Sequence, residues 1–310
     1  MSPIPPTQQP RACDLEPEVQ TYLAAISQST DALRKLYPLD TPEKADLASP
    51  LWDEIYTAIG FTTLDVELEH AILTHKSTAE LMPAVREATV QCEAAFEIIT
   101  ARRLVQARDP DEAREILNNG PIHPFYVHFA NLEWTTLLNA VGKTPQSVAI
   151  LGSGALPETS IWITDWAAAH GTQIHVHNVE LVPDRLELSR GVHQALGLLD
   201  QSSNASVSFE TGDARNAPSD LSVYDAVYFN ATVGSTVEEK ESILLDVVSR
   251  MRKGAHMVTR STYSLKTMAY PPVSLQSPRV LGKLRPVLTL HSSGEVGKTV
   301  NATVIVSRVL

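Results

Sequence analysis

The segment SVAILGSGALPETS, Ser147–Ser160, decides the fold expected for this chain of 310 residues. An apolar run suited to a buried strand leads into a Gly-Ser-Gly turn, and the Pro-Glu-Thr-Ser run that follows suits a helix start. Gly152 and Gly154 remove side chains at the turn, so the backbone can approach a ligand closely. Pro157 replaces the third glycine of a Gly-x-Gly-x-x-Gly pattern, which favours a nucleoside without phosphates over a dinucleotide.

Short apolar runs alternate with helical patterns from this segment to the C-terminus. The expected strands are 147–151, 173–179, 206–210, 224–230, 254–262, 284–291 and 300–309, and the expected helices are 160–170, 183–199 and 238–251. Continuously apolar strands that alternate with helices indicate a parallel sheet covered on both faces. The last two runs have no helix between them and predict a closing antiparallel hairpin, as in methyltransferase-type sheets.

The chain before residue 140 has a helical period instead. In EVQTYLAAISQSTDALRKLY the apolar residues recur on one helical face, and we expect four to six helices with Pro83 as a start or a kink. The prediction is therefore an α/β fold in three parts. These are a disordered lead-in over 1–13, a helical domain over 14–140 that forms a lid over the site, and a Rossmann-like, class I methyltransferase-like domain over 141–310.

Composition excludes several classes of protein. An apolar content of 43% supports a sizeable core, and a net charge of −11 disfavours a broad nucleic-acid surface and attraction to anionic membranes. No apolar run approaches the length of a bilayer span, and the N-terminus lacks a signal-peptide pattern. The positions of Cys13 and Cys92 indicate neither a disulfide nor a metal site. We expect a cytoplasmic protein that acts on a small molecule.

Polar residues stand where successive predicted strands end. Glu180 can accept hydrogen bonds from ribose hydroxyls or cap a helix, Asp213 can hold an adenine amino group or cap the next helix, and Asn230 ends the fourth strand. Ligands of such sheets bind at the carboxyl ends of the strands. In this order the positions predict an S-adenosylmethionine site. Its expected residues are Gly152, Ser153, Gly154, Glu180, Asp213, Ala214 and Asn230.

From about Val90 onward the sequence resembles the nicotianamine synthase family. VAILGSGALPETSI is similar to the family's Gly-Ser-Gly-x-x-Pro-x-Thr-Ser-Ile turn, and Pro157, Thr159 and Ser160 are its specific part. HPFYVHFANLEWTTL, YDAVYFNATVG, TRSTYSLKTMAYPPV and HSSGEVGKTVNATVIVSR resemble further family segments in the same order.

The resemblance implies an unusual use of S-adenosylmethionine. In this family an amine attacks the γ-carbon of the methionine arm, methylthioadenosine leaves, and an aminocarboxypropyl group is transferred. The same attack within one molecule closes an azetidine ring. Nicotianamine synthases perform the transfers and the closure, whereas the similar azetidine-2-carboxylate synthases perform the closure alone.

The resemblance also suggests catalytic residues. Tyr126 stands at the family's Tyr-Tyr position, where a ring face can stabilise a sulfonium, although a core aromatic at the domain boundary is the alternative. Glu93 and Glu97 fall where the family carries helical glutamates, one of them a base, although they could also form a solvated face. Arg260 suits a substrate carboxylate or a structural salt bridge, and Asn230 faces the same cleft.

No metal is expected. The spacing of His123 and His128, with Glu133 further on, is not that of a helical pair of ligands, and no cysteine is near.

Departures from the family pattern affect the expected product. The family's Asp-x-Asp after the second strand is represented by Glu180 with Val182 in place of the second acid, and His123, Phe125 and His128 replace family residues. These changes lie where further substrates would dock, so the sequence favours intramolecular closure to azetidine-2-carboxylate. A full nicotianamine synthase, a conventional methyltransferase and a non-catalytic binding protein are the alternatives. The oligomeric state, the proton acceptor and the pathway stay open.

Overall fold

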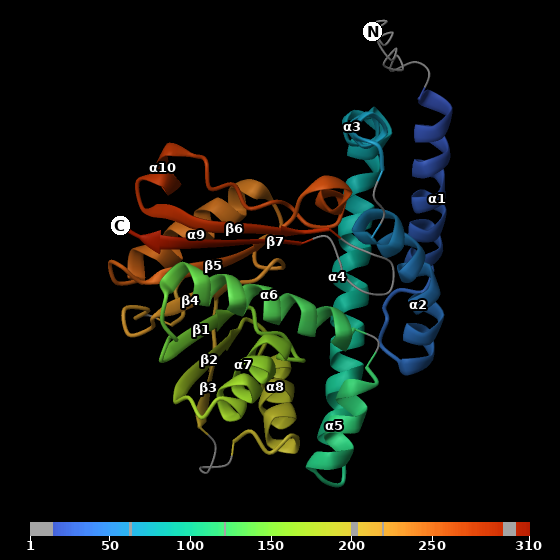
Figure 1. Cartoon of the computed structure of the whole chain (residues 1–310). Helices are drawn as coiled ribbons and strands as arrows, with labels where there is room; N and C mark the ends of the chain where they lie inside the picture. The colour runs from blue at the N-terminus through green and yellow to red at the C-terminus, as the bar shows by residue number, and fades with distance from the viewer. Residues whose placement is uncertain (1–14, 62–63, 121, 200–203, 219, 294–301) are drawn as a thin grey trace, which may run out of the picture.

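The computed structural model describes residues 15–61, 64–120, 122–199, 204–218, 220–293 and 302–310, which form a group of helices beside a helix-covered sheet (Figure 1). The lead-in expected over 1–13 and Cys13 lie outside these residues. None of the described helices is long and apolar enough to cross a membrane.

The N-terminal part is helical, as expected. The described residues form six α-helices here, within the expected four to six. They are α1 (Glu16–Arg34), α2 (Pro42–Tyr56), α3 (Val66–Thr74), α4 (Lys76–Val105), α5 (Pro110–Asn118) and α6 (His123–Val141), with a π-helical turn η2 (Thr57–Phe61) after α2. Side-chain caps set the starts of α2 and α5, where Thr41 and Asp109 accept hydrogen bonds from backbone N–H groups. Pro83 lies inside α4 and does not begin it.

Helix α4 connects the two parts of the molecule. It packs against α1 and α2 on one side and against α8 (Pro183–Ala195) on the other. The core around α1, α2 and α4 includes Leu265, Met268 and Tyr270 from the second half of the chain. Although α6 belongs to the segment predicted as a lid, its residues Trp134 and Leu137 pack on the sheet. The helical part and the sheet therefore share buried surface.

The sheet has seven strands in the order β3-β2-β1-β4-β5-β7-β6. The strands are β1 (Ser147–Leu151), β2 (Ile174–Glu180), β3 (Ala205–Thr211), β4 (Ala226–Phe229), β5 (His256–Ser261), β6 (Leu284–Ser292) and β7 (Ala302–Val309). Strands β1 to β5 pair in parallel, and β7 pairs antiparallel with both β5 and β6. The predicted class I methyltransferase-like sheet and its closing hairpin are confirmed.

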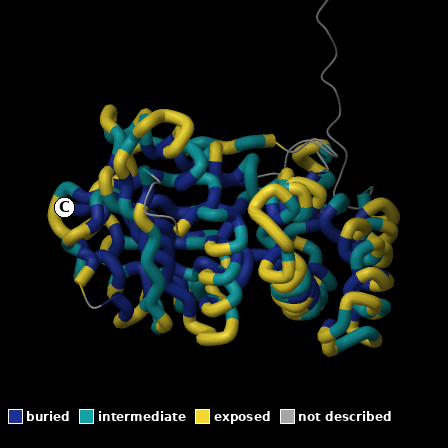
Figure 2. Tube along the Cα trace, turned by 90° about the horizontal axis from the view of Figure 1, so that it is seen from below, coloured by how far each residue is buried: buried dark blue, intermediate teal, exposed yellow. Residues whose placement is uncertain are grey.

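Helices cover both faces of the sheet, because alternate strand residues point to opposite sides. From β1, Val148 and Ile150 pack with α6 and α7 (Glu158–Ala169), whereas Ala149 and Leu151 pack with α9 (Val237–Arg250). Figure 2 shows the resulting pattern, with buried positions along the strands and exposed positions on the outer turns of the helices. The 3-10 helix η3 (Ser264–Met268) and the short helix α10 (Pro278–Leu281) lie where the sequence predicted no element.

The turn after β1 requires both of its glycines. Gly152 and Gly154 have φ values of 76° and 73°, in the left-handed region. A Cβ at Gly154 would lie 2.6 Å from Oε2 of Glu97 on α4, and one at Gly152 would lie 2.8 Å from a methyl group of Val233. The carboxylate of Glu180 accepts hydrogen bonds from the N–H of Gly154 at 3.0 Å and of Val182 at 3.1 Å. The turn is thus held between the end of β2 and α4.

We predict that Gly154→Ala destabilises the protein more than Gly142→Ala. Both positions are left-handed, with φ values of 73° and 72°, but a Cβ at Gly142 would meet nothing within 4 Å. The backbone change costs about 1–2 kcal/mol at each position, and only Gly154→Ala also displaces Glu97. The free energy of unfolding, measured in urea, should fall roughly twice as far for Gly154→Ala. Equal losses at the two positions would show that Glu97 does not confine the turn.

Candidate active site

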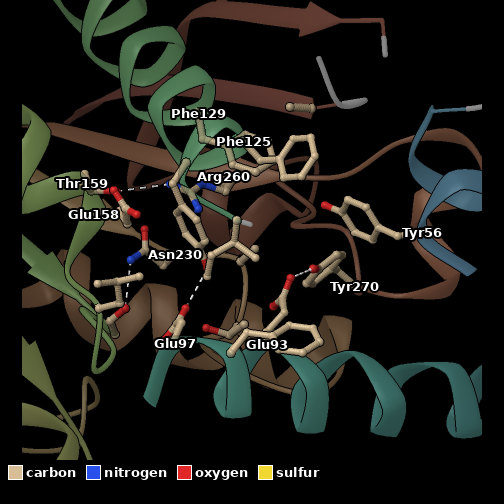
Figure 3. Close-up of a pocket in the computed structure, with 18 of the residues that line it drawn as sticks. Tyr56, Glu93, Glu97, Phe125, Phe129, Glu158, Thr159, Asn230, Arg260 and Tyr270 are labelled. Carbon is tan, nitrogen blue, oxygen red and sulfur yellow. Dashed lines mark hydrogen bonds between the residues drawn. The ribbon is translucent and has the colours of Figure 1, made fainter. Parts of the chain in front are cut away.

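Two adjoining cavities lie at the carboxyl ends of the strands. One, of about 390 Å³, lies between the helical part and the sheet and is here called the central cavity (Figure 3). The other, of about 300 Å³, lies over the ends of β1, β2 and β3 and is here called the strand-end cavity. Glu93, Glu97, Gly152 and Thr232 line both, so the two cavities meet at these residues.

The strand-end cavity contains most of the residues predicted to bind a nucleoside. Gly152, Gly154, Glu180, Asp213 and Ala214 all line it, whereas Ser153 and Asn230 line the central cavity. Such a position, at the carboxyl ends of neighbouring parallel strands, is where ligands of this kind of sheet bind.

The acids of the strand-end cavity already have protein partners. Both carboxylate oxygens of Glu180 accept backbone hydrogen bonds, so this residue orders the turn, and its pairing with ribose stays a prediction. Asp213 pairs with Arg215 at 2.9 Å, and Arg215 also pairs with Glu239 at 2.6 Å. Neither Arg215 nor Glu239 was predicted from the sequence, because the two charged residues are 24 positions apart and meet only in the folded chain.

Glu97 and Tyr126 form a hydrogen-bonded pair where the two cavities meet. The Tyr126 hydroxyl donates to Oε1 of Glu97 at 2.6 Å. Burial raises the pKa of Glu97 to about 8, the bond from Tyr126 opposes that rise, and the nearby charge of Glu93 adds to it. The group can therefore exchange a proton near neutral pH. Both glutamates line the central cavity, and their catalytic roles stay predictions.

A second acid and a buried lysine occupy the side of the central cavity nearer the helical part. The Tyr270 hydroxyl donates to Glu93, whose pKa is raised by burial. Lys266 Nζ lies 4.7 Å from the ring centre of Phe129, 5.3 Å from that of Tyr56 and 5.5 Å from that of Tyr270. Burial lowers the pKa of Lys266 to about 7, although the charge of Glu93 opposes this shift.

Lys266, Tyr270 and Tyr56 were not predicted as site residues from the sequence. Lys266 and Tyr270 lie in the segment TRSTYSLKTMAYPPV, which was quoted for its family resemblance, so that segment offered a signal. Tyr56 ends a helix with an ordinary amphipathic pattern and offered none.

Arg260 is engaged by the protein itself. Its Nε and Nη2 donate to the two carboxylate oxygens of Glu133 at 2.7 and 3.0 Å, and Nη2 also lies 3.3 Å from the Thr159 hydroxyl oxygen. Glu133 is 1% exposed, so this ion pair is buried. The two-point pairing expected with a substrate carboxylate is made with Glu133 instead, which was the alternative considered. Arg260 still lines the central cavity, and its role in binding substrate stays a prediction.

The three residues considered as metal ligands each contact a different protein group. His123 pairs with Glu158 at 2.9 Å, His128 lies 3.4 Å from the Ser292 hydroxyl, and Glu133 pairs with Arg260. Within the described ranges, no group of three or more His, Cys, Asp or Glu side chains is arranged to hold a metal ion.

Comparison with known sequences identifies relatives. A family model described as "Nicotianamine synthase protein" matches residues 15–309. Nicotianamine synthase 3 of Oryza sativa subsp. indica is 30% identical over 182 residues, which cover 58% of this chain and 50% of the rice protein. Nicotianamine synthase 2 of Oryza sativa subsp. japonica is 30% identical over 219 residues, which cover 69% of this chain and 64% of that protein. The chain thus spans about half to two thirds of these relatives.

Comparison with solved structures gives the same fold. The crystal structure of MtNAS in complex with MTA and tNA aligns with a TM-score of 0.74 at 21% identity, covering 94% of this chain and 98% of MtNAS. A mutant of MtNAS in complex with S-adenosylmethionine aligns with a TM-score of 0.68 at 22% identity, over 93% and 98% of the two chains. At such identities the structures show a shared fold, and the family model spans all but the ends of the sequence. The chain therefore belongs to the nicotianamine synthase family.

Proposed function

We propose that the chain is an enzyme that transfers 3-amino-3-carboxypropyl groups from S-adenosylmethionine to an α-amine and closes an azetidine ring, as a nicotianamine synthase does. The observation that carries this proposal is the Glu97–Tyr126 pair where the strand-end and central cavities meet. Family membership supports it, as do the related crystal structures that contain S-adenosylmethionine or MTA and tNA.

The arrangement of the cavities suggests how the substrate binds. The nucleoside occupies the strand-end cavity between Glu180 and Asp213, and the methionine arm passes Gly152 into the central cavity. There the sulfonium and the γ-carbon lie beside Tyr126, whose ring face attracts a cation. Glu93, Glu97 and Tyr126 come from the helical part, which in this proposal covers the ligand and excludes water.

The chemistry needs one proton acceptor. The attacking amine forms a bond to the γ-carbon as the bond from that carbon to sulfur breaks, and methylthioadenosine leaves with the electron pair. The amine must also lose a proton to become a nucleophile. Glu97, with a pKa of about 8, is suited to take that proton near neutral pH.

The extent of the central cavity and the family match are the arguments for transfer over closure alone. Beyond Glu97 the cavity reaches Lys266, whose cation can meet the carboxylate of an acceptor, whereas Arg260 is already paired with Glu133. A second candidate is closure of one S-adenosylmethionine to azetidine-2-carboxylate, which Val182, Phe125 and His128 favoured on sequence alone. The family match supports the transfer, and we place the full synthase first.

Identification of the products separates these functions. With S-adenosylmethionine as sole substrate, we expect methylthioadenosine and, by mass spectrometry, a product with more than one aminocarboxypropyl unit. Glu97→Gln should lower the rate about 100-fold or more, because the proton acceptor is lost. Free azetidine-2-carboxylate as the dominant product would establish the second candidate. Adenosylhomocysteine formed only with an added acceptor would indicate a methyltransferase, and no turnover would indicate a binding protein.

The pH dependence of the reaction should report on Glu97. Because the carboxylate must be deprotonated to act, kcat should rise with pH through an apparent pKa near 8. Tyr126→Phe removes a hydrogen bond that lowers this pKa, so the rise should move to higher pH. Tyr56→Phe, which removes another hydroxyl from the same cavity, is the control and should leave its position unchanged. An unchanged profile in Tyr126→Phe would exclude Glu97 as the group that titrates.

Lys266 should determine how many units are joined. If its ammonium holds the carboxylate of the acceptor, Lys266→Met should lower the share of products with more than one unit and raise the share of azetidine-2-carboxylate. Lys266→Arg should restore part of the longer products, since it keeps the charge. The ratio of products, measured at equal release of methylthioadenosine, is the readout. A ratio unchanged in Lys266→Met would remove Lys266 from the acceptor site.

A further inference from the structure

A chain of buried hydrogen bonds runs from α8 under α7 to the central cavity. Asn178 on β2 is 0% exposed and lines that cavity, and its Nδ2 donates to the Ser160 hydroxyl oxygen at 3.0 Å. The Ser160 oxygen lies 2.9 Å from Nε2 of His193, and Nδ1 of His193 lies 2.9 Å from the carbonyl oxygen of Ser189. None of these side chains takes part in the chemistry described above.

The groups in this series of hydrogen bonds determine which atom donates and which accepts in each bond. The Ser189 carbonyl can only accept, so Nδ1 of His193 carries a hydrogen. Burial lowers the pKa of His193 to about 4, which keeps the ring neutral and leaves Nε2 as an acceptor. Ser160 must therefore donate its hydrogen to His193, and its oxygen can only accept from Asn178. The amide of Asn178 is thus held with its nitrogen toward Ser160.

The other end of the same amide lacks a partner. Across the part of the chain that the structure describes, Oδ1 of Asn178 makes no hydrogen bond. Leaving a buried acceptor unpaired is unfavourable, because the lost hydrogen bond to water is not replaced. Rotating the amide would not help, because its oxygen would then face Ser160, whose only hydroxyl hydrogen is used by His193. The series of hydrogen bonds therefore leaves Oδ1 of Asn178 available to accept a hydrogen bond from a ligand.

A second unpaired amide oxygen lies on the same side of the sheet. Nδ2 of Asn230 donates to the carbonyl oxygen of Gly152 at 2.9 Å, and Oδ1 of Asn230 has no partner among the described residues. Asn178 lies on β2 and Asn230 follows β4, the two strands that flank β1. Glu158, the carboxylate beside them in the central cavity, pairs with His123. Two buried neutral acceptors are thus left unpaired in residues that line the cavity, which suits a ligand with N–H donors.

We propose that Oδ1 of Asn178 accepts a hydrogen bond from the α-amino group of the substrate's amino-acid part, and that Ser160 and His193 are positioning residues for that bond. This inference rests on the proposed function, which supplies an adenosyl amino acid as ligand. A neutral amide suits the task, because a carboxylate in its place would stabilise the ammonium form and oppose the loss of the proton.

Binding of unreactive ligands to the full chain tests the inference. S-adenosylhomocysteine carries the α-amino group, and its des-amino analogue differs only in lacking it. By calorimetry, Asn178→Ala should weaken binding of S-adenosylhomocysteine about 10-fold or more, as for loss of a hydrogen bond to a charged group. Binding of the des-amino analogue should change less than about two-fold. Ser160→Ala, which frees the amide to rotate, should reproduce the same selective loss in milder form.

Each other outcome counts against the proposal. Equal weakening of both ligands, or no change in either, would overturn the amine contact of Asn178 and leave the proposed function standing. A selective loss in Asn178→Ala that is absent in Ser160→Ala would overturn the positioning role of Ser160 and His193. A wild-type chain that binds neither ligand would overturn both the inference and the proposed function. If Asn178→Ala fails to fold, Ser160→Ala alone decides, and equal weakening of both ligands in it overturns the proposal.

Discussion

The close approach of Glu97 to the turn after β1 is the constraint on which the site depends. A single methyl group at Gly154 would stand 2.6 Å from Oε2 of Glu97, so glycine leaves the space that this carboxylate occupies above the turn. The approach brings the acid to the junction of the two cavities. It also buries the carboxyl group, which raises its pKa toward neutrality. The place of the proposed base and its raised pKa thus both depend on this close packing.

Opposite charges and aromatic rings share a small buried volume around that junction. Glu93 lies with Tyr270 and Lys266, and Arg260 is fixed by Glu133. Burial favours the neutral forms of acids and of lysine alike, so Glu93, Glu97 and Lys266 are all shifted toward neutral pH. Such a site can exchange protons and still hold a zwitterionic substrate, as the proposed reaction requires.

The strand ends could be predicted from the sequence because their signals are local. Gly152, Gly154, Glu180 and Asp213 each stand at or just after the end of a strand, and parallel strands bring their carboxyl ends to one edge. The pairing of Arg260 with Glu133 could not be chosen in advance over a substrate carboxylate, since the two residues meet only through the packing of α6 on the sheet. Lys266 and Tyr56 are far apart in the sequence and meet only in the folded protein. The proposed role of Ser160 depends on His193, which belongs to no motif in the sequence.

Titration of the Glu97 side chain tests the central claim most directly. The carboxyl carbon, observed by NMR in protein labelled at glutamate and assigned by comparison with Glu97→Gln, should titrate with a pKa near 8. The same signal in Tyr126→Phe should titrate at a higher pH, because the hydrogen bond that favours the carboxylate is gone. A Glu97 pKa near 4.5, the ordinary value for glutamate, would show that the carboxyl group is not buried at the junction and would contradict the account.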